Sequence, residues 1–294
     1  MNEYTNAIEI KDVTKKYDGF TLDHVSFNVP RGSIMGFIGQ NGAGKTTTIR
    51  SMLNLIRIDS GSISMLGMDH LKQEQAIKER IAVVFDEMPF HDFYKAGDLA
   101  KIFSGLFPKW DNAVYQQYLD RFQLPQKKKL GQFSKGMKMK LQIACALSHD
   151  AELLIMDEAT TGLDPVVRNE ILDIFLEYLQ DENHSIFMSS HITSDLEKIA
   201  DSVTFIDRGK ILISGYKDDV LESHGILKCS KADYRNIDPE DIISARLTDF
   251  GAEAMVADRA AAARKYSGIV LDPCTLDDIM VYYVHNTGRK EWTS

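Results

Sequence analysis

Eight consecutive residues near the N-terminus, GQNGAGKT from Gly39 to Thr46, place glycines, a lysine and a threonine at the spacing of a phosphate-binding loop. Glycines let backbone N–H groups curl around phosphates, while Lys45 reaches the outer phosphates and Thr46 ligates magnesium. A glycine-rich turn with a chance lysine is the alternative. The candidate phosphate-binding residues are Gly39, Gln40, Asn41, Gly42, Ala43, Gly44, Lys45, Thr46 and Thr47.

Two adjacent acids follow a second apolar run. Leu153–Met156 reads as a buried strand, and Asp157 and Glu158 come directly after it. The C-terminal edge of a parallel sheet is where α/β proteins place their sites. Asp157 is expected to hold Mg²⁺ and Glu158 to polarise an attacking water as a general base. The alternative, an acidic surface cap on the strand, is disfavoured by the upstream loop.

The segment FSKGM, from Phe133 to Met137, resembles the signature motif of ABC ATPases and precedes Asp157 in that family's order. Ser134 and Gly136 match the motif, whereas Lys135 replaces its first glycine and Met137 its usual glutamine. Ser134 also fits an N-cap for a helix running to Leu147. The two roles are compatible because a helix N-terminus presents N–H donors to phosphate.

Further residues match the same family in chain order, over residues 4 to about 220. The resemblance implies that the loop 161–164, ending in Asp164, links two active sites, and that His191 contacts the terminal phosphate of ATP. It also implies that Tyr17 stacks on the adenine. A histidine after a strand and an aromatic in a loop each have a purely structural alternative.

One departure concerns the metal. The family usually carries a glutamine after the strand 81–85, but this chain has Asp86 followed by Glu87. A carboxylate is a hard oxygen ligand suited to Mg²⁺, so Asp86 is a candidate metal ligand beside Thr46 and Asp157. The alternative is that Asp86 and Glu87 only solvate the loop.

These residues require an α/β fold to position them. Alternation over 8–13 and 25–29 predicts antiparallel edge strands around a loop that contains Tyr17, and apolar runs separated by helical patterns predict a parallel sheet. The expected phosphate-loop ATPase core occupies residues 1–222, with a helical subdomain over about 88–150. Residues 223–294 are predicted to form a small α+β accessory domain, whose helix 276–284 packs in its own core or serves a partner.

Composition narrows the function. The net charge of −9 disfavours nucleic acid as a partner, and three dispersed cysteines fit reduced thiols. Residues 1–4 show no secretory pattern, and we find no apolar run of about 18 residues that could cross a bilayer. The sequence therefore predicts a cytoplasmic protein.

The resemblance implies an ATP-binding and ATP-hydrolysing subunit, similar to those of bacterial drug, peptide or antibiotic-resistance exporters. Such a subunit pairs head to tail with a second ATPase subunit, identical or a sister, and lies on the inner face of the membrane through a separate permease. The alternative is an ABC ATPase that acts on ribosomes or DNA without a permease, although such proteins usually carry two cores or a coiled coil. A plain phosphate-loop kinase or GTPase would lack the Ser134 motif and His191.

Overall fold

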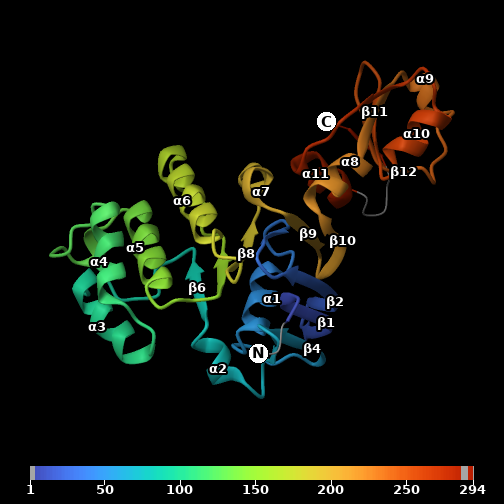
Figure 1. The fold of residues 1–294 in the computed structure, drawn as a ribbon. Helices are drawn as coiled ribbons and strands as arrows, with labels where there is room; N and C mark the ends of the chain where they lie inside the picture. Colours follow the sequence, from blue (N-terminus) through green and yellow to red (C-terminus); the bar gives the residue numbers. More distant parts are fainter. Residues whose placement is uncertain (1–3, 286–290, 294) are drawn as a thin grey trace.

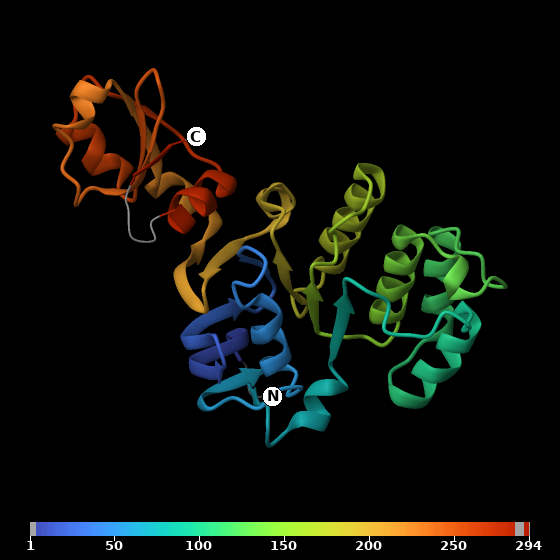
Figure 2. The same ribbon diagram turned by 180° about the vertical axis from the view of Figure 1, so that it is seen from behind.

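The computed structural model describes residues 4–285 and 291–293, which form three sheets and the helices packed on them (Figure 1). The expectation that the chain starts without a secretory pattern falls partly on residues 1–3, which lie outside the described residues. So do residues 286–290 and 294 of the predicted accessory domain. In both ribbon views, helices α3–α5 and the C-terminal sheet lie at opposite ends of the molecule (Figure 2).

The first sheet is antiparallel, in the order β2-β1-β4-β5, as predicted for the edge of the core. Its first two strands are longer than the sequence suggested, so Tyr17 ends a strand and does not lie in a loop. Cross-strand pairing of Tyr17 with Phe20 leaves only a two-residue turn. The strands are β1 (Asn6–Tyr17), β2 (Phe20–Pro30), β4 (Ser60–Met65) and β5 (Met68–Asp69).

The second sheet is mixed, in the order β10-β9-β3-β8-β7-β6, with only β10 antiparallel to its neighbour. Strands β3, β7 and β8 are buried throughout, which explains the apolar runs within them, 34–38, 153–156 and 186–188. The parallel arrangement gathers the ends of β3, β6, β7 and β8 at one edge. The strands are β3 (Ile34–Ile38), β6 (Ile81–Phe85), β7 (Leu153–Asp157), β8 (Ser185–Ser190), β9 (Ser202–Asp207) and β10 (Lys210–Tyr216).

A cluster of aromatic rings joins these two sheets. Phe27 of β2 lies 5.1 Å from Phe37 and 5.7 Å from Phe187, measured between ring centroids. Phe37 of β3 and Phe187 of β8 are fully buried, and offset aromatic pairs add to the free energy gained by burying their surface. The antiparallel sheet is therefore fixed against the strands that lead to the candidate site.

Up to residue 199, helices α1, α6 and α7 follow parallel strands, α2 lies between β5 and β6, and the others form a group between β6 and β7. The predicted helical region contains α3, α4 and α5, and Tyr115, Leu119 and Leu141 from it are buried in the main core. The helices up to residue 199 are α1 (Lys45–Met52), α2 (Glu74–Lys78), α3 (Ala96–Leu106), α4 (Asn112–Arg121), the 3₁₀ turn η1 (Leu130–Gln132), α5 (Lys135–Leu147), α6 (Pro165–Tyr178) and α7 (Thr193–Ile199).

The C-terminal residues build a third sheet, in the order β14-β11-β13-β12-β15. Its helix α11 does not pack only within this part, because its buried Leu276 and Ile279 belong to the same core cluster as Leu196 and Ile199 of α7. The elements are α8 (Lys217–Ser223), β11 (Gly225–Cys229), α9 (Lys231–Tyr234), β12 (Ile242–Leu247), β13 (Ala252–Val256), α10 (Arg259–Lys265), β14 (Val270–Asp272), α11 (Leu276–His285) and β15 (Glu291–Thr293).

Candidate nucleotide site

The glycine-rich loop joins β3 to α1 and surrounds a buried lysine. Lys45, the first residue of α1, donates from Nζ to the Gly39 carbonyl at 2.6 Å and the Gln40 carbonyl at 3.2 Å. Gly44 has φ of 116°, and a Cβ there would lie 2.9 Å from Leu22 Cδ2. Only glycine fits this position without strain, and the loop thereby keeps its backbone donors at the N-terminus of α1.

The rest of the loop is divided between an exposed outer part and a buried base. Gln40 and Asn41 are exposed, whereas Ala43 is buried and accepts from the backbone N–H of Gly209 at 2.8 Å. Phe20 also supports the loop, since its Cζ would lie 3.0 Å from a Cβ on Gly44. The sequence analysis did not identify Phe20, because only the fold brings β2 beside this loop.

Two oxygen-bearing side chains meet at the start of α1. Thr46 donates from Oγ1 to Asp157 Oδ2 at 2.9 Å, and Ser189 donates to the other carboxylate oxygen of Asp157 at 2.7 Å. Hydroxyl and carboxylate oxygens are ligands that Mg²⁺ prefers, so this pair fits the predicted metal site. Ser189 was not predicted as a site residue; its place opposite Asp157 follows from the pairing of β7 with β8.

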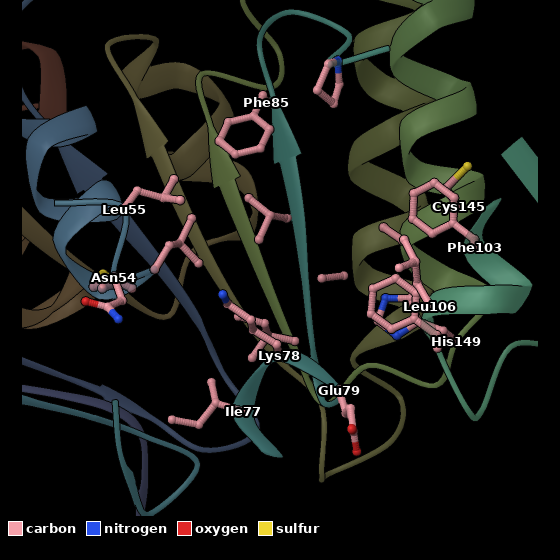
Figure 3. A pocket seen from close by; sticks show the side chains of 18 of the residues that line it. Asn54, Leu55, Ile77, Lys78, Glu79, Phe85, Phe103, Leu106, Cys145 and His149 are labelled. Carbon is pink, nitrogen blue, oxygen red and sulfur yellow. The ribbon is translucent and has the colours of Figure 1, made fainter. Parts of the chain in front are cut away.

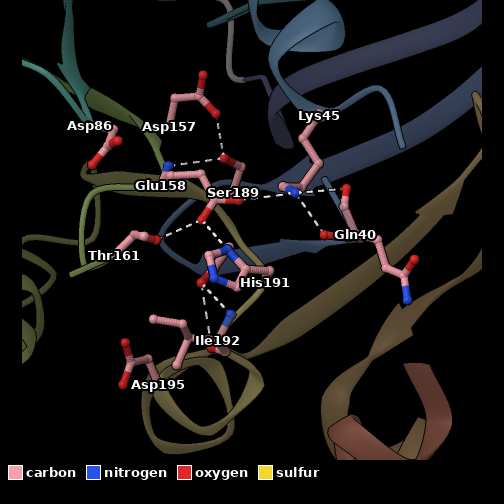
Figure 4. Close-up of polar contacts among 12 residues, drawn as sticks. Gln40, Lys45, Asp86, Asp157, Glu158, Thr161, Ser189, His191, Ile192 and Asp195 are labelled. Atoms are coloured by element: carbon pink, nitrogen blue, oxygen red, sulfur yellow. Dashed lines mark hydrogen bonds and ion pairs between the residues drawn. The ribbon is translucent and has the colours of Figure 1, made fainter. Parts of the chain in front are cut away.

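Glu158 lies at the centre of a hydrogen-bonded group (Figure 4). Its Oε1 is 3.0 Å from Lys45 Nζ, and its Oε2 contacts Thr161 Oγ1 at 2.8 Å and His191 Nδ1 at 2.6 Å. The backbone of Glu158 is left-handed, with φ of 55°, an unusual conformation for a non-glycine residue. Its N–H bonds to Ser189, which holds the residue in this conformation.

The environment of Glu158 favours its ionised form. Burial disfavours the charge, but contacts with Lys45 and Thr161 outweigh it, so the pKa of the carboxyl group lies below its ordinary value. Glu158 is therefore a carboxylate at neutral pH. A carboxylate in this position can accept a proton from a water molecule.

Two of the other predicted site residues cap helices. Ser134 is exposed at the N-terminus of α5 and accepts from the Met137 N–H at 3.2 Å, which confirms the predicted helix cap. Gly136 follows it and faces Val167 of α6. Asp164 caps α6 in the same way.

Two of the remaining positions have partners that the sequence analysis did not name. Tyr17 is 44% exposed, and Lys15 Nζ lies 5.4 Å from its ring centroid. Asp86 forms an ion pair with Lys135, with 2.5 Å between Oδ1 and Nζ. Asp86 therefore has a charged partner within the chain, while its role as a metal ligand and the solvating alternative both stay predictions.

An apolar cavity of about 440 Å³ separates α1 and α2 from the helical region (Figure 3). Leu55 and Leu106 line it from opposite sides and are 60% and 64% exposed. His149 lies at its margin, stacked on Phe107 at 3.9 Å, and its Nδ1 finds no hydrogen-bond partner among the described residues. Burial lowers the pKa of His149 to about 4, so the ring is neutral at physiological pH.

Comparisons with known proteins agree with this geometry. Residues 22–161 match the family model described as ABC transporter. The chain is 39% identical, over 71% of its length and 69% of the relative's, to a bacitracin transport ATP-binding protein of Bacillus licheniformis. It is 34% identical to a lantibiotic transport ATP-binding protein of Streptococcus pyogenes, over 70% of this chain and 89% of that one.

A solved ATP-binding subunit of an ABC transporter superposes with a TM-score of 0.66 at 27% identity, covering 73% of this chain and 91% of the other. We find no helix in the described residues that is long and apolar enough to span a bilayer. The family model begins before the phosphate loop and ends after Glu158, so it contains the phosphate and acidic residues of the site. Together with the relatives, it shows that this chain belongs to the ABC transporter family as one of its nucleotide-binding, ATP-binding subunits.

Proposed function

We propose that this subunit hydrolyses ATP and that hydrolysis drives a separate membrane permease, a peptide-antibiotic exporter. The observation that carries the proposal is the convergence of Lys45, Glu158 and His191 within 3.0 Å contacts at the phosphate loop. The named relatives transport bacitracin and lantibiotics, which supports a peptide cargo. The permease places this subunit on the cytoplasmic face of the membrane.

Each residue has a distinct part in the reaction. Lys45 binds the outer phosphates of ATP. The positive charge of its buried ammonium group offsets the negative charge of their oxygens. Glu158 orients the attacking water and accepts its proton. His191 and Thr161 hold the Glu158 carboxylate in place, and His191 turns to the terminal phosphate when nucleotide enters.

Thr46 and Asp157 would hold Mg²⁺, which neutralises charge on the phosphate oxygens when bound. Ser189 positions the Asp157 carboxylate by donating a hydrogen bond to it. The predicted contribution of Asp86 to the metal requires its carboxylate to leave Lys135 or to use its second oxygen. Tyr17 is proposed to stack on the adenine.

A second ATPase subunit completes the site. Ser134 is exposed, and the N-terminus of α5 presents donors outward from its own chain. We therefore place the phosphates of one subunit against Ser134 and Gly136 of the other, with Asp164 near the junction between the two sites. The net charge of −9 supports the absence of a nucleic-acid partner.

The apolar cavity beside Leu55 and Leu106 fits a short helix of the permease (Figure 3). Exposed leucines on both walls provide apolar surface whose burial favours docking. The cavity separates α1, which carries the phosphate loop, from the helical region, which carries the signature segment. A helix seated there contacts both parts and transmits their relative movement.

Affinity purification from gently solubilised membranes of the native cell tests this proposal. We expect a polytopic membrane protein in comparable amount, and loss of it with Leu106→Asp, which puts a charge into the cavity. Val270→Asp, at a similarly exposed position on β14, serves as the matched control. Recovery of ribosomes or DNA-bound proteins without a membrane protein would contradict the proposal and favour the permease-free alternative.

A further inference from the structure

Two residues that depart from the family's usual pattern contact each other. Asp86 stands where a glutamine is usual, and Lys135 replaces the first glycine of the signature segment. Their side chains form a hydrogen-bonded ion pair of 2.5 Å although 49 residues separate them in the chain. The two departures therefore supply opposite charges to one contact.

The pair links the helical region to the central sheet. Asp86 follows β6, whose last residue, Phe85, is bonded through its backbone N–H and carbonyl to the Gln142 amide of α5. Lys135 is the first residue of that helix. A Cβ built on Gly162 would lie 3.4 Å from Lys135 Nζ, so the ammonium also lies against the loop after β7. One side chain thus contacts the loops that follow two neighbouring strands.

The geometry indicates that this pair positions the start of α5 and contributes little to stability. Both side chains are 42% exposed, and ion pairs at such positions contribute little to the free energy of unfolding. The location is different from that of an ordinary surface pair, because Phe85 is registered with Asp157 on the adjacent strand. A shift of the Asp86 loop relative to α5 therefore changes where Ser134 stands with respect to the acidic residues.

We propose that Lys135 is a positioning residue, and that the Asp86–Lys135 pair is a clasp that sets the signature segment against the loops after β6 and β7. The proposal rests on the ATPase function proposed above and names a feature particular to this chain. The clasp fixes Ser134 and Gly136 for the second subunit and occupies Asp86 with Lys135. Replacing either residue with a neutral one leaves the charge of the other without its partner beside the nucleotide site.

A double-mutant cycle on the full-length subunit tests the clasp. Asp86→Asn and Lys135→Met are each expected to lower kcat for ATP about tenfold. Their dissociation constants for ATP and for Mn²⁺, used as the metal probe, stay within about twofold of wild type. The family-type double variant, Asp86→Gln with Lys135→Gly, and the reversed pair, Asp86→Lys with Lys135→Asp, each recover kcat to within about threefold.

Lys138→Met is the matched control. Lys138 lies three residues further along α5 and pairs with Asp92 at 3.0 Å, within the helical region, so its loss leaves kcat unchanged. If both double variants are as slow as the slower single variant, the clasp is wrong. If Asp86→Asn weakens Mn²⁺ binding about tenfold or more while Lys135→Met does not, Asp86 acts through the metal and not through Lys135, and the clasp is also wrong.

Distance measurement between spin labels provides a readout that does not depend on activity. Labels at the exposed Gln117 of α4 and Asp173 of α6, in a Cys229→Ser background that leaves only buried native cysteines, report the helical region against the core. Each single variant broadens the distance distribution, and the reversed pair narrows it again. An unchanged distance distribution in both single variants overturns the clasp, whether or not the wild type hydrolyses ATP. Absence of ATP hydrolysis by the wild type would refute only the proposed function.

Discussion

The phosphate loop and the signature segment are the two halves of the proposed nucleotide site, and they differ in how completely one chain builds them. Lys45 is buried, and Lys45, Asp157 and Glu158 all have short contacts within the chain. Ser134 and Lys135 are exposed, and the Ser134 side chain caps its own helix by accepting a hydrogen bond from the Met137 N–H. The difference leads to the expectation that one chain suffices to bind nucleotide, whereas the proposed hydrolysis requires the exposed half to meet a second subunit.

Glu158→Gln should have the largest effect, because it removes the proton acceptor and keeps the shape. We expect kcat to fall about 1,000-fold, while ATP affinity is retained and an ATP-dependent dimer accumulates. ATPase assays and light scattering with and without ATP measure these effects. The control is Glu177→Gln, which removes only an exposed pair with Arg121. Hydrolysis at the wild-type rate would disprove the assignment of the catalytic base.

Lys45→Ala tests whether the buried half binds nucleotide without help. Removing an ammonium that the loop carbonyls and Glu158 hold in place should weaken ATP binding by about 100-fold. Titration calorimetry on the dilute monomer measures this loss. Lys210→Ala, which removes an exposed partner of Asp23, should bind ATP like the wild type. Equal affinities in both variants would contradict the comparison.

Acidification should lower the free energy of unfolding through His149, a buried neutral histidine just after α5, the helix that begins in the signature segment. Its pKa is about 4 in the folded chain and about 6.5 when unfolded, so the unfolded state takes up the proton first as pH falls. The free energy of unfolding should drop by about 2 kcal/mol between pH 7 and 5 from this group alone. His149→Phe keeps the stacking on Phe107 and should flatten that slope in urea titrations. Parallel pH curves for the two proteins would exclude this source.

Ser134→Ala should have the smallest effect on the isolated chain. Loss of the cap costs about 1 kcal/mol of helix stability, and ATP affinity of the monomer stays unchanged. The ATP-dependent dimer should nevertheless form at higher protein concentration than in the wild type. Ser230→Ala removes a similar cap from α9 in the C-terminal part and provides the control. Identical dimerisation of the two variants would show that Ser134 serves only its helix.

Local signals predicted the strand, loop and helix start that carry the phosphate loop. The strand 34–38, the loop after it and the lysine that opens the next helix lie within one short stretch, so spacing alone positions them. Glu158 was placed by its position after β7, but its left-handed backbone and its contact with His191 depend on the pairing of β7 with β8. Ser189 was missed for the same reason.

Contacts between distant segments could not be read from the sequence. Asp86 was interpreted from its type as a metal ligand, but a lysine 49 residues away provides its ion-pair partner. Phe20 contacts the phosphate loop only because the fold brings β2 beside that loop. His149 reaches the margin of the cavity only because α5 packs beside it. The length of β1 was underestimated because Lys15 and Lys16 interrupt its apolar alternation, although the hairpin continues to Tyr17.

The packing of α11 on α7 decides where this chain can be shortened. Leu276 donates its backbone N–H to Glu197 at 2.6 Å, and Thr193 donates to Asp277 at 3.3 Å, so α11 is joined to the helix that follows His191. A fragment ending at residue 222 would lack α11 and would expose part of the apolar core that α11 shares with α7. Such a fragment should aggregate, since newly exposed apolar surface promotes association.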